Sequence, residues 1–226
     1  MESQEKTIFS KDLPPIWEEN IILRESGENI RWNIVFVGKI PKRVDLKIHL
    51  VAPKSRAAVS LVCIGRERMN TDVNIAFLHN APDTYGRVIS KAALFDESRF
   101  VLKGMLHVTE RGVGADTYFL GKALLLSPAA RGEIYPYLEI ETNEVKASHG
   151  SSVGKLDERD MFYLGTRGIG HGDAQAILLG SFFRELGRLL PDEERSIYPR
   201  TRRPRVYPWM NGLRCGIPFH GQAHGA

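Results

Sequence analysis

The sequence predicts a mainly β protein whose strands stack as a parallel solenoid, and three observations support this prediction. Short runs rich in β-branched residues follow one another between residues 29 and 149, as expected for consecutive strands. Apolar and polar residues alternate within several of these runs, and a period of two is typical of strands with one buried face. The alternating apolar residues of one run are Val44, Leu46, Ile48 and Leu50.

The third observation is a weak internal repeat. The segment SKAALF at residues 90–95 returns as GKALLL at residues 121–126, an offset of 31 positions. His79 and His107 each end an apolar run and lie 28 positions apart. Repeats of roughly 20 to 50 residues are typical of solenoids. An antiparallel β-sandwich is the alternative that these two echoes leave open.

The strands are expected in order along the chain, each bounded by Gly, Asn, Pro, Asp or Ser, which mark turns. The clearest runs cover residues 34–37, 44–51, 59–64, 73–78 and 100–108.

The character of the sequence changes after residue 149, where two helices are expected. Asp157 suits the N-cap of the first helix, and Leu156 with Met161 could form a hydrophobic staple. The second helix should begin within residues 170–173 and run to Leu190, where a proline stops it. Its apolar face is predicted to consist of Ala174, Ile177, Leu178, Phe182, Leu186 and Leu189.

Four segments follow from this pattern. They are an N-terminal segment (1–28), a β-helix core (29–150), a helical segment (151–192) and a basic tail rich in Pro and Gly (193–226), which we expect to be disordered. The net charge of +4 arises in the tail, because residues 195–226 carry six Arg and no Lys, Asp or Glu. The body of the chain therefore gives no sign of a nucleic-acid-binding fold, although an adaptor that binds nucleic acid through the tail remains an alternative.

Composition excludes several other classes of protein. With only two cysteines, Cys63 and Cys215, the chain is not a disulfide scaffold. It has no apolar run of about 18 residues and no signal peptide pattern, so a cytoplasmic location without membrane association is expected. The phosphate-binding, nucleophile-elbow and zinc-protease motifs are absent from the sequence, which argues against a self-contained enzyme.

His149 is the foremost candidate for chemistry. It lies in the segment KASHGSS among small residues, which should leave its imidazole accessible as a metal ligand or proton carrier. A histidine in a turn that bonds to the backbone is the alternative. His79 and His107 fit positions at strand ends better than a metal pair, and Cys63 fits a buried apolar position.

An ordered series of motifs between residues 86 and 190 carries a resemblance to a known family. The motifs are KAALFD at 91–96, RFVLKG at 99–104, LLLS at 124–127, PYLEI at 136–140, VKASHG at 145–150 and RGI at 167–169. This series resembles the SufB/SufD family of iron–sulfur cluster assembly proteins, most closely its SufD branch.

The resemblance implies a right-handed parallel β-helix followed by a short helical segment. It further implies a scaffold subunit, not an enzyme, that pairs with a SufB-like chain or with itself. The helical segment would bind SufC, an ABC-type ATPase, and the predicted docking residues are Phe182, Phe183, Arg184 and Leu186. Clusters would be assembled at the interface between paired β-helices, where His149 would lie as a shared metal ligand with Lys146, Glu139 and Glu141 around it.

Three departures from the family pattern limit the expected chemistry. Ala147 stands where SufD-like chains usually have Cys, residues 130–133 lack the Cys of SufB-like chains, and Gly150 replaces a SufB Glu. Because iron–sulfur clusters are mostly held by three or four thiolates, we expect no cluster bound stably by the lone chain. A transient cluster in the complex is expected instead.

A carbohydrate-active β-helix is a further alternative. It would need a groove rich in Asp and aromatic residues, whereas Asp45, Asp72 and Asp116 are scattered along the sequence.

Overall fold

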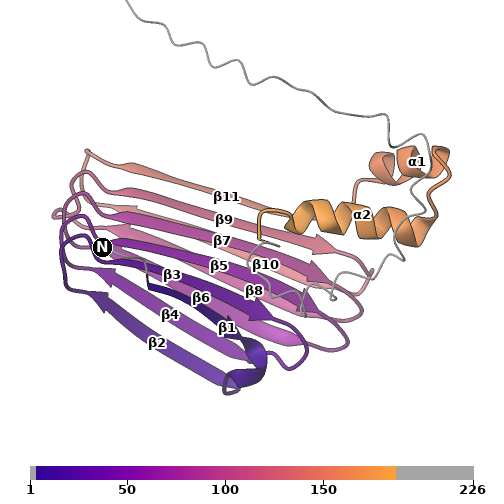
Figure 1. The fold of residues 1–226 in the computed structure, drawn as a ribbon, viewed down its shortest axis with the longest axis horizontal. Helices are drawn as coiled ribbons and strands as arrows, with labels where there is room; N and C mark the ends of the chain where they lie inside the picture. Colours follow the sequence, from indigo (N-terminus) through magenta and orange to yellow (C-terminus); the bar gives the residue numbers. More distant parts are fainter. Residues whose placement is uncertain (1–3, 187–226) are drawn as a thin grey trace, which may run out of the picture.

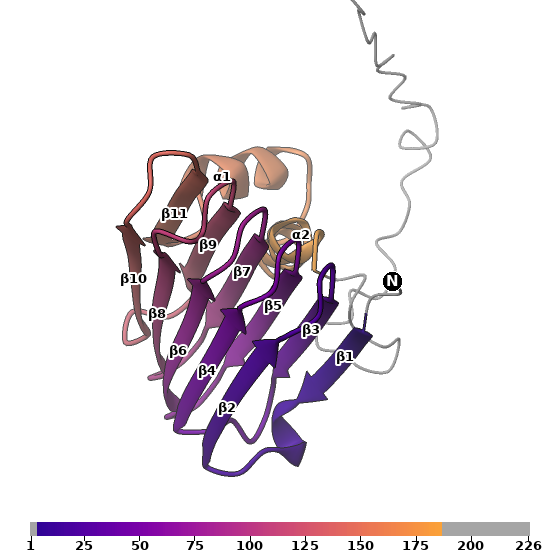
Figure 2. The same cartoon turned by 90° about the vertical axis from the view of Figure 1, so that its left-hand side faces the viewer.

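A computed structural model describes residues 4–186 as a solenoid of parallel strands followed by two helices. Two sheets face each other (Figures 1 and 2), with strand orders β1-β3-β5-β7-β9-β11 in sheet A and β10-β8-β6-β4-β2 in sheet B. The chain alternates between the sheets, so each coil contributes one strand to each. Neighbouring strands in both sheets pair in parallel, which confirms the parallel β-helix and shows that the sandwich alternative is wrong.

The strands and helices have the following bounds. They are β1 Gln4–Phe9, a 3-10 turn Ser10–Asp12, β2 Ile16–Leu23, β3 Asn29–Phe36, β4 Arg43–Leu50, β5 Arg56–Gly65, β6 Asn70–His79, β7 Tyr85–Leu94, β8 Arg99–Val108, β9 Asp116–Leu125, β10 Arg131–Ile140, β11 Lys146–Gly154, α1 Glu158–Thr166 and α2 His171–Phe183.

The solenoid begins earlier than residue 29, since β1 and β2 both join the sheets. In β2 the polar run Glu18, Glu19 and Asn20 interrupts the apolar alternation, and this interruption hides the strand from sequence analysis. At the other end β11 continues to Gly154, four residues beyond the expected end of the core.

Strand register explains one of the two repeats. Lys91 of β7 pairs with Lys122 of β9, so SKAALF and GKALLL lie side by side on neighbouring strands. His79 instead pairs with Val108, and His107 pairs with Leu78. The two histidines are therefore one position out of register and point to opposite faces of sheet B, which rules out a metal pair.

The core fills the space between the sheets with the inward-facing half of each strand. Val44, Leu46, Ile48 and Leu50 are all buried there, as their alternation predicts. Cys63 is fully buried in the same core, and burial raises the pKa of its thiol far above the ordinary value. Cys63 thus packs as an apolar residue. The largest fully buried side chains of the core are Phe36, Phe77, Phe100 and Phe119.

One corner of the solenoid is a column of residues with left-handed backbone conformation. Gly27, Lys54, Asp83 and Gly114 have φ angles of 74°, 61°, 56° and 75°. The amide of each donates to a carbonyl one coil further along, at Pro53, Pro82, Val113 and Glu144, over 3.0, 3.1, 2.9 and 2.6 Å. Each corner is therefore bonded to the next.

The two helices follow β11 and lie beside the end of sheet A (Figure 1). The Asp157 side chain caps α1 by accepting from the amide of Arg159 at 2.8 Å, as predicted. In α2 the buried residues are Ala174, Leu179 and Phe183, so the predicted face is partly wrong. Because α2 is apolar on several sides, its sequence pattern does not single out the side that faces the sheet.

The side of α2 that is buried packs on the outer face of sheet A. Leu179, Phe183 and Leu186 form a cluster there with Val62 and Ala93. The predicted helix end at Leu190 and the tail 193–226 lie outside the described residues. In the described part of the chain, no helix has the length and apolarity needed to cross a lipid bilayer.

Candidate functional site

The last coil of the solenoid, formed by β10 and β11, carries most of the residues singled out by the sequence. β11 pairs only with β9, and β10 pairs only with β8, so each strand is the edge of its sheet among the described residues. An edge strand presents a row of unpaired backbone donors and acceptors. The inner surface of this coil is also the end of the hydrophobic core.

His149 faces into this open end. It pairs in register with Phe119, which is fully buried and points between the sheets, so the His149 side chain points the same way. No strand of the described chain covers β11, and His149 is exposed. His149 is a residue of strand β11, and its ring makes no hydrogen bond with the described residues. The prediction of an accessible imidazole is therefore confirmed, and the alternative of a turn histidine bonded to the backbone is wrong.

Apolar side chains are exposed on the same inward-facing side of the last coil as His149. Ile140 of β10 and Val153 of β11 are each 41% exposed, although their register partners Val108 and Ala123 are buried. These positions would be core positions if one more coil followed. The opposite end differs, since Ile8 and Trp17 of the first strands are buried.

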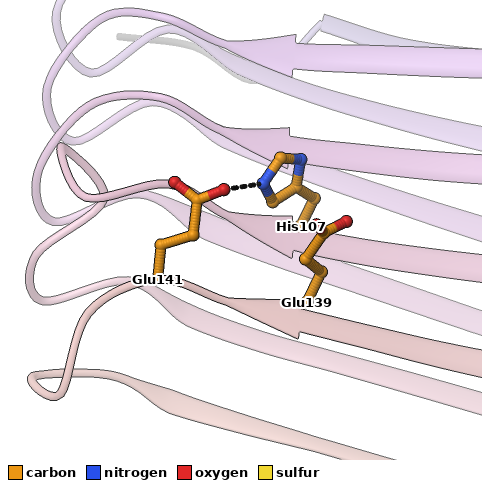
Figure 3. A group of neighbouring side chains, drawn as sticks. All are labelled: His107, Glu139 and Glu141. Carbon is orange, nitrogen blue, oxygen red and sulfur yellow. Dashed lines mark hydrogen bonds and ion pairs between the residues drawn. The ribbon is translucent and has the colours of Figure 1, made fainter.

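The structure does not bring Glu139, Glu141 and Lys146 together with His149, although the sequence analysis predicted them around it. Glu139 pairs in register with His107 and lies on the outer face of sheet B, and Glu141 follows β10 on the same side. Lys146 begins β11 opposite Asp116 of β9, on the outer face of sheet A. Within the described chain, neither Glu139 nor Glu141 bonds to His149 or Lys146, and both lie with His107 instead (Figure 3).

The His107 cluster, defined as His107, Glu139 and Glu141, was not expected from the sequence. The Nε2 atom of His107 lies 2.8 Å from Oε1 of Glu141, and one ligand atom from each of the three side chains lies within 4.8 Å of the others. The hydrogen bond from His107 and a second one from the amide of Glu110 hold the pKa of Glu141 below its usual value. The sequence feature that could have revealed the cluster is the spacing of 32 positions between His107 and Glu139, which is about the length of one coil.

The predicted docking residues lie at the end of α2 and are mostly turned towards the solenoid. Phe183 and Leu186 are each 2% exposed, and Phe182 packs on the same cluster. Arg184 is exposed. The large exposed aromatic residues of the helical segment are Phe162 and Tyr163 on α1, which the sequence analysis did not single out.

The outer face of sheet B also carries a groove of about 480 Å³. Arg99 reaches Asp72 at 3.0 Å and Glu133 at 3.4 Å within it. Tyr135 donates a 2.7 Å hydrogen bond to Glu133, and this bond raises the pKa of the tyrosine. Both carboxylates are therefore paired with a cation, unlike the free acid and base that glycoside hydrolysis requires. The complete lining is Arg43, Asp72, Asn74, Arg99, Val101, Lys103, Glu133, Tyr135 and Tyr137.

Known proteins that are similar to this chain are named for iron–sulfur cluster assembly. The sequence model described as "SUF system FeS cluster assembly, SufBD core domain" matches residues 17–182. The iron–sulfur cluster assembly protein SufD of Escherichia coli is 35% identical over 115 residues, which are 51% of this chain and 27% of that protein.

Two further relatives match over a longer stretch. A SufBD family protein of Mycobacterium bovis is 27% identical over 172 residues, covering 75% of this chain and 20% of that protein. One from Synechocystis is 25% identical over 169 residues, covering 75% and 33%. The chain thus spans at most about a third of the length of these three relatives.

The matched stretch contains nearly the whole solenoid, the Ser-His-Gly segment at its open end and most of the helical segment. The motifs on which the predicted resemblance to SufD rests lie within this matched stretch. The chain belongs to the SufBD family of the SUF system for iron–sulfur cluster assembly.

Proposed function

We propose that this chain is a scaffold subunit of a SUF-type complex, pairing through the open end of its solenoid with a SufB-like chain or a second copy of itself. A cluster would be assembled transiently at the shared interface. The helical segment would bind an ABC-type ATPase of the SufC kind, and the ATPase activity would reside in that partner.

The exposed inner surface of the last coil is the observation that carries the pairing proposal. Ile140 and Val153 occupy core positions yet stay 41% exposed, and transfer of such apolar surface out of water is favourable. The free edges of β10 and β11 offer backbone groups to a further strand. A partner with a similar end would cover both features.

His149 is proposed as the contribution of this chain to the shared site. Its exposed imidazole points into the surface that pairing would enclose, and histidine is the usual substitute for a thiolate in cluster ligation. The chain has two cysteines, of which Cys63 is buried in the core and Cys215 lies outside the described residues. In this proposal the thiolates come from the partner, and Glu139, Glu141 and Lys146 line the outer sides of the same coil.

The helical segment has exposed residues suited to docking of the ATPase. Phe162 is 74% and Tyr163 57% exposed on α1, and aromatic anchors are enriched at interfaces. Phe182, Phe183 and Leu186, predicted for docking, pack against sheet A and would instead carry motion of the docked partner into the solenoid. Arg184 remains available as a contact.

The test is co-purification of the full chain with a SufB-like chain and an ABC-type ATPase, followed by a cluster assembly assay. We expect His149→Ala to keep the complex together and to reduce assembly. The double variant Phe162→Ala/Tyr163→Ala should reduce binding of the ATPase and leave pairing with the SufB-like chain unchanged. Unchanged assembly by the His149→Ala complex would refute the proposed site, and failure to recover any complex would refute the scaffold role.

A further inference from the structure

The His107 cluster is a set of metal-ligating side chains on the outer face of sheet B, and the proposed function assigns no bound ion to it. His107 and Glu139 are direct register partners on the outer face of β8 and β10, so the backbone holds their side chains next to each other. Glu141 approaches from the chain just beyond β10 (Figure 3). His149 faces the opposite, inner side of the last coil.

The spacing of the three groups suits a small cation. The 2.8 Å between His107 Nε2 and Glu141 Oε1 is close to the separation of about 3 Å for two neighbouring ligands at bonds of roughly 2.1 Å. A carboxylate oxygen of Glu139 lies within 4.8 Å of both other ligand atoms, a distance that one side-chain rotation can close. The second oxygen of Glu141 accepts from the amide of Glu110 at 3.3 Å, which orients the carboxylate as outer partners of metal ligands do.

The described residues provide a bonding partner for only one of the two carboxylates of the cluster. One imidazole faces two carboxylates, and Glu139 makes no hydrogen bond or ion pair within residues 4–186, while Glu141 bonds to His107 and a backbone amide. A simple surface ion pair would need only one of the two glutamates. A divalent cation would use both.

We propose that His107, Glu139 and Glu141 bind one divalent first-row transition-metal ion, such as Zn²⁺, Mn²⁺ or Fe²⁺. One imidazole and two carboxylates form a ligand set of borderline to hard character, which suits these ions better than Cu⁺. Three protein ligands leave further coordination positions to water, as in metal sites that exchange ligands. This site is independent of the proposed scaffold function, because it lies within a single chain and requires no cluster.

The test is titration of the purified full chain with Zn²⁺ by calorimetry, repeated with Mn²⁺ and electron paramagnetic resonance. We expect one ion per chain. Glu139→Gln, Glu141→Gln and His107→Gln should each weaken binding by at least about tenfold, the low end of what loss of even an outer partner costs. Glu144→Gln, a nearby exposed carboxylate outside the cluster, is the matched control and should bind as the unaltered chain does.

Glu139→Gln is the decisive variant, because that side chain has no partner in the described structure and its replacement should leave the fold intact, as circular dichroism would verify. Absence of binding at millimolar Zn²⁺ would overturn the proposal. So would equal binding by Glu139→Gln and the unaltered chain, or binding that is lost in His149→Ala while Glu139→Gln retains it. None of these results depends on complex formation or on cluster assembly.

Discussion

The Nζ atom of Lys91, on the outer face of sheet A, lies 2.7 Å from the carbonyl oxygen of Phe182 near the end of α2. The same ammonium group is 2.9 Å from Glu185, and the Lys91 side chain is only 7% exposed. A cation at the carboxyl end of a helix also interacts favourably with the helix dipole. Lys91 therefore joins the helical segment to the solenoid.

Replacement of Lys91 by Met should loosen α2 while the solenoid stays folded. Loss of a hydrogen bond from a charged donor to a partly buried carbonyl costs about 1.5–3 kcal/mol. We expect faster amide hydrogen exchange in residues 171–186 and unchanged exchange in β5. Lys103→Met, which removes an exposed lysine on sheet B that has no partner in the described residues, serves as the control. Equal protection of α2 in both variants would contradict a joining role for Lys91.

His79 should make the stability of the fold fall in mild acid. It is buried, and burial lowers its pKa from 6.5 to about 4. The Thr84 hydroxyl donates to the carbonyl of Ala81 at 3.2 Å, so its oxygen accepts from Nδ1 of His79 at 2.8 Å. This leaves Nε2 unprotonated and without a partner among the described residues. The unfolded chain therefore binds a proton at higher pH than the folded chain does.

The stability that His79 contributes is complete above pH 6.5 and is lost as the pH falls towards 4, by on the order of 3 kcal/mol. Urea unfolding between pH 7 and 5 measures this slope. His79→Gln should flatten it, whereas His49→Gln, at a less buried histidine of sheet B, should change it less. A slope that is the same in His79→Gln and the unaltered chain would exclude the effect.

Gly104→Ala should destabilise the solenoid core. A Cβ atom built on Gly104 would lie 2.0 Å from the ring of Phe119, which is fully buried and cannot move away freely. Overpacking of this kind typically costs about 1–3 kcal/mol. Gly154→Ala, where a Cβ atom meets nothing within 4 Å, is the matched control. Thermal unfolding should separate the two variants by several degrees, and coincident transitions would argue against tight packing at Gly104.

Pairing through the open end predicts a sharp effect of charge there. Val153→Glu places a carboxylate on the inward-facing side of β11, which also carries His149, and should abolish self-association or pairing with a SufB-like chain. Ile16→Glu puts the same charge on an exposed residue at the opposite end, where Ile16 is 58% exposed, and should have no effect. Light scattering of the chain alone and with its partner measures both. Equal loss of pairing in the two variants would show that the open end is not the interface.

The lone chain should bind no iron–sulfur cluster. Cys63 is enclosed in the core, and the described residues include no other thiolate, whereas clusters are mostly held by three or four. Anaerobic reconstitution with iron and sulfide followed by visible absorption spectroscopy tests this. A stable cluster spectrum from the purified monomer would contradict the shared-site proposal, and the same spectrum from Cys63→Ala would point to His149 or the tail.

The sequence predicted the parallel solenoid because its repeat and its alternation are properties of single strands and single coils. SKAALF and GKALLL lie in register as neighbours, and Asp157 caps α1 as its position suggested. Strand β2 was missed because Glu18 and Glu19 break its alternation.

The grouping of side chains was harder to predict, since it depends on which face and which coil each residue joins. Glu139 and His149 are ten positions apart in sequence but point to different sides of the last coil. His107 and Glu139 are 32 positions apart and lie next to each other as register partners, with ligand atoms within 4.8 Å. A shift of one position in register would reverse both facts, and no local pattern sets register to that accuracy.

The column of left-handed corner residues at Gly27, Lys54, Asp83 and Gly114 has a consequence for how the chain can change in length. Since each corner amide bonds only to the adjacent coil, the structure resembles a linear array whose units sense their nearest neighbours alone. Whole coils could then be inserted or deleted in the middle while the terminal surfaces keep their shape. Evolution could in this way adjust the distance between the two ends without redesigning either.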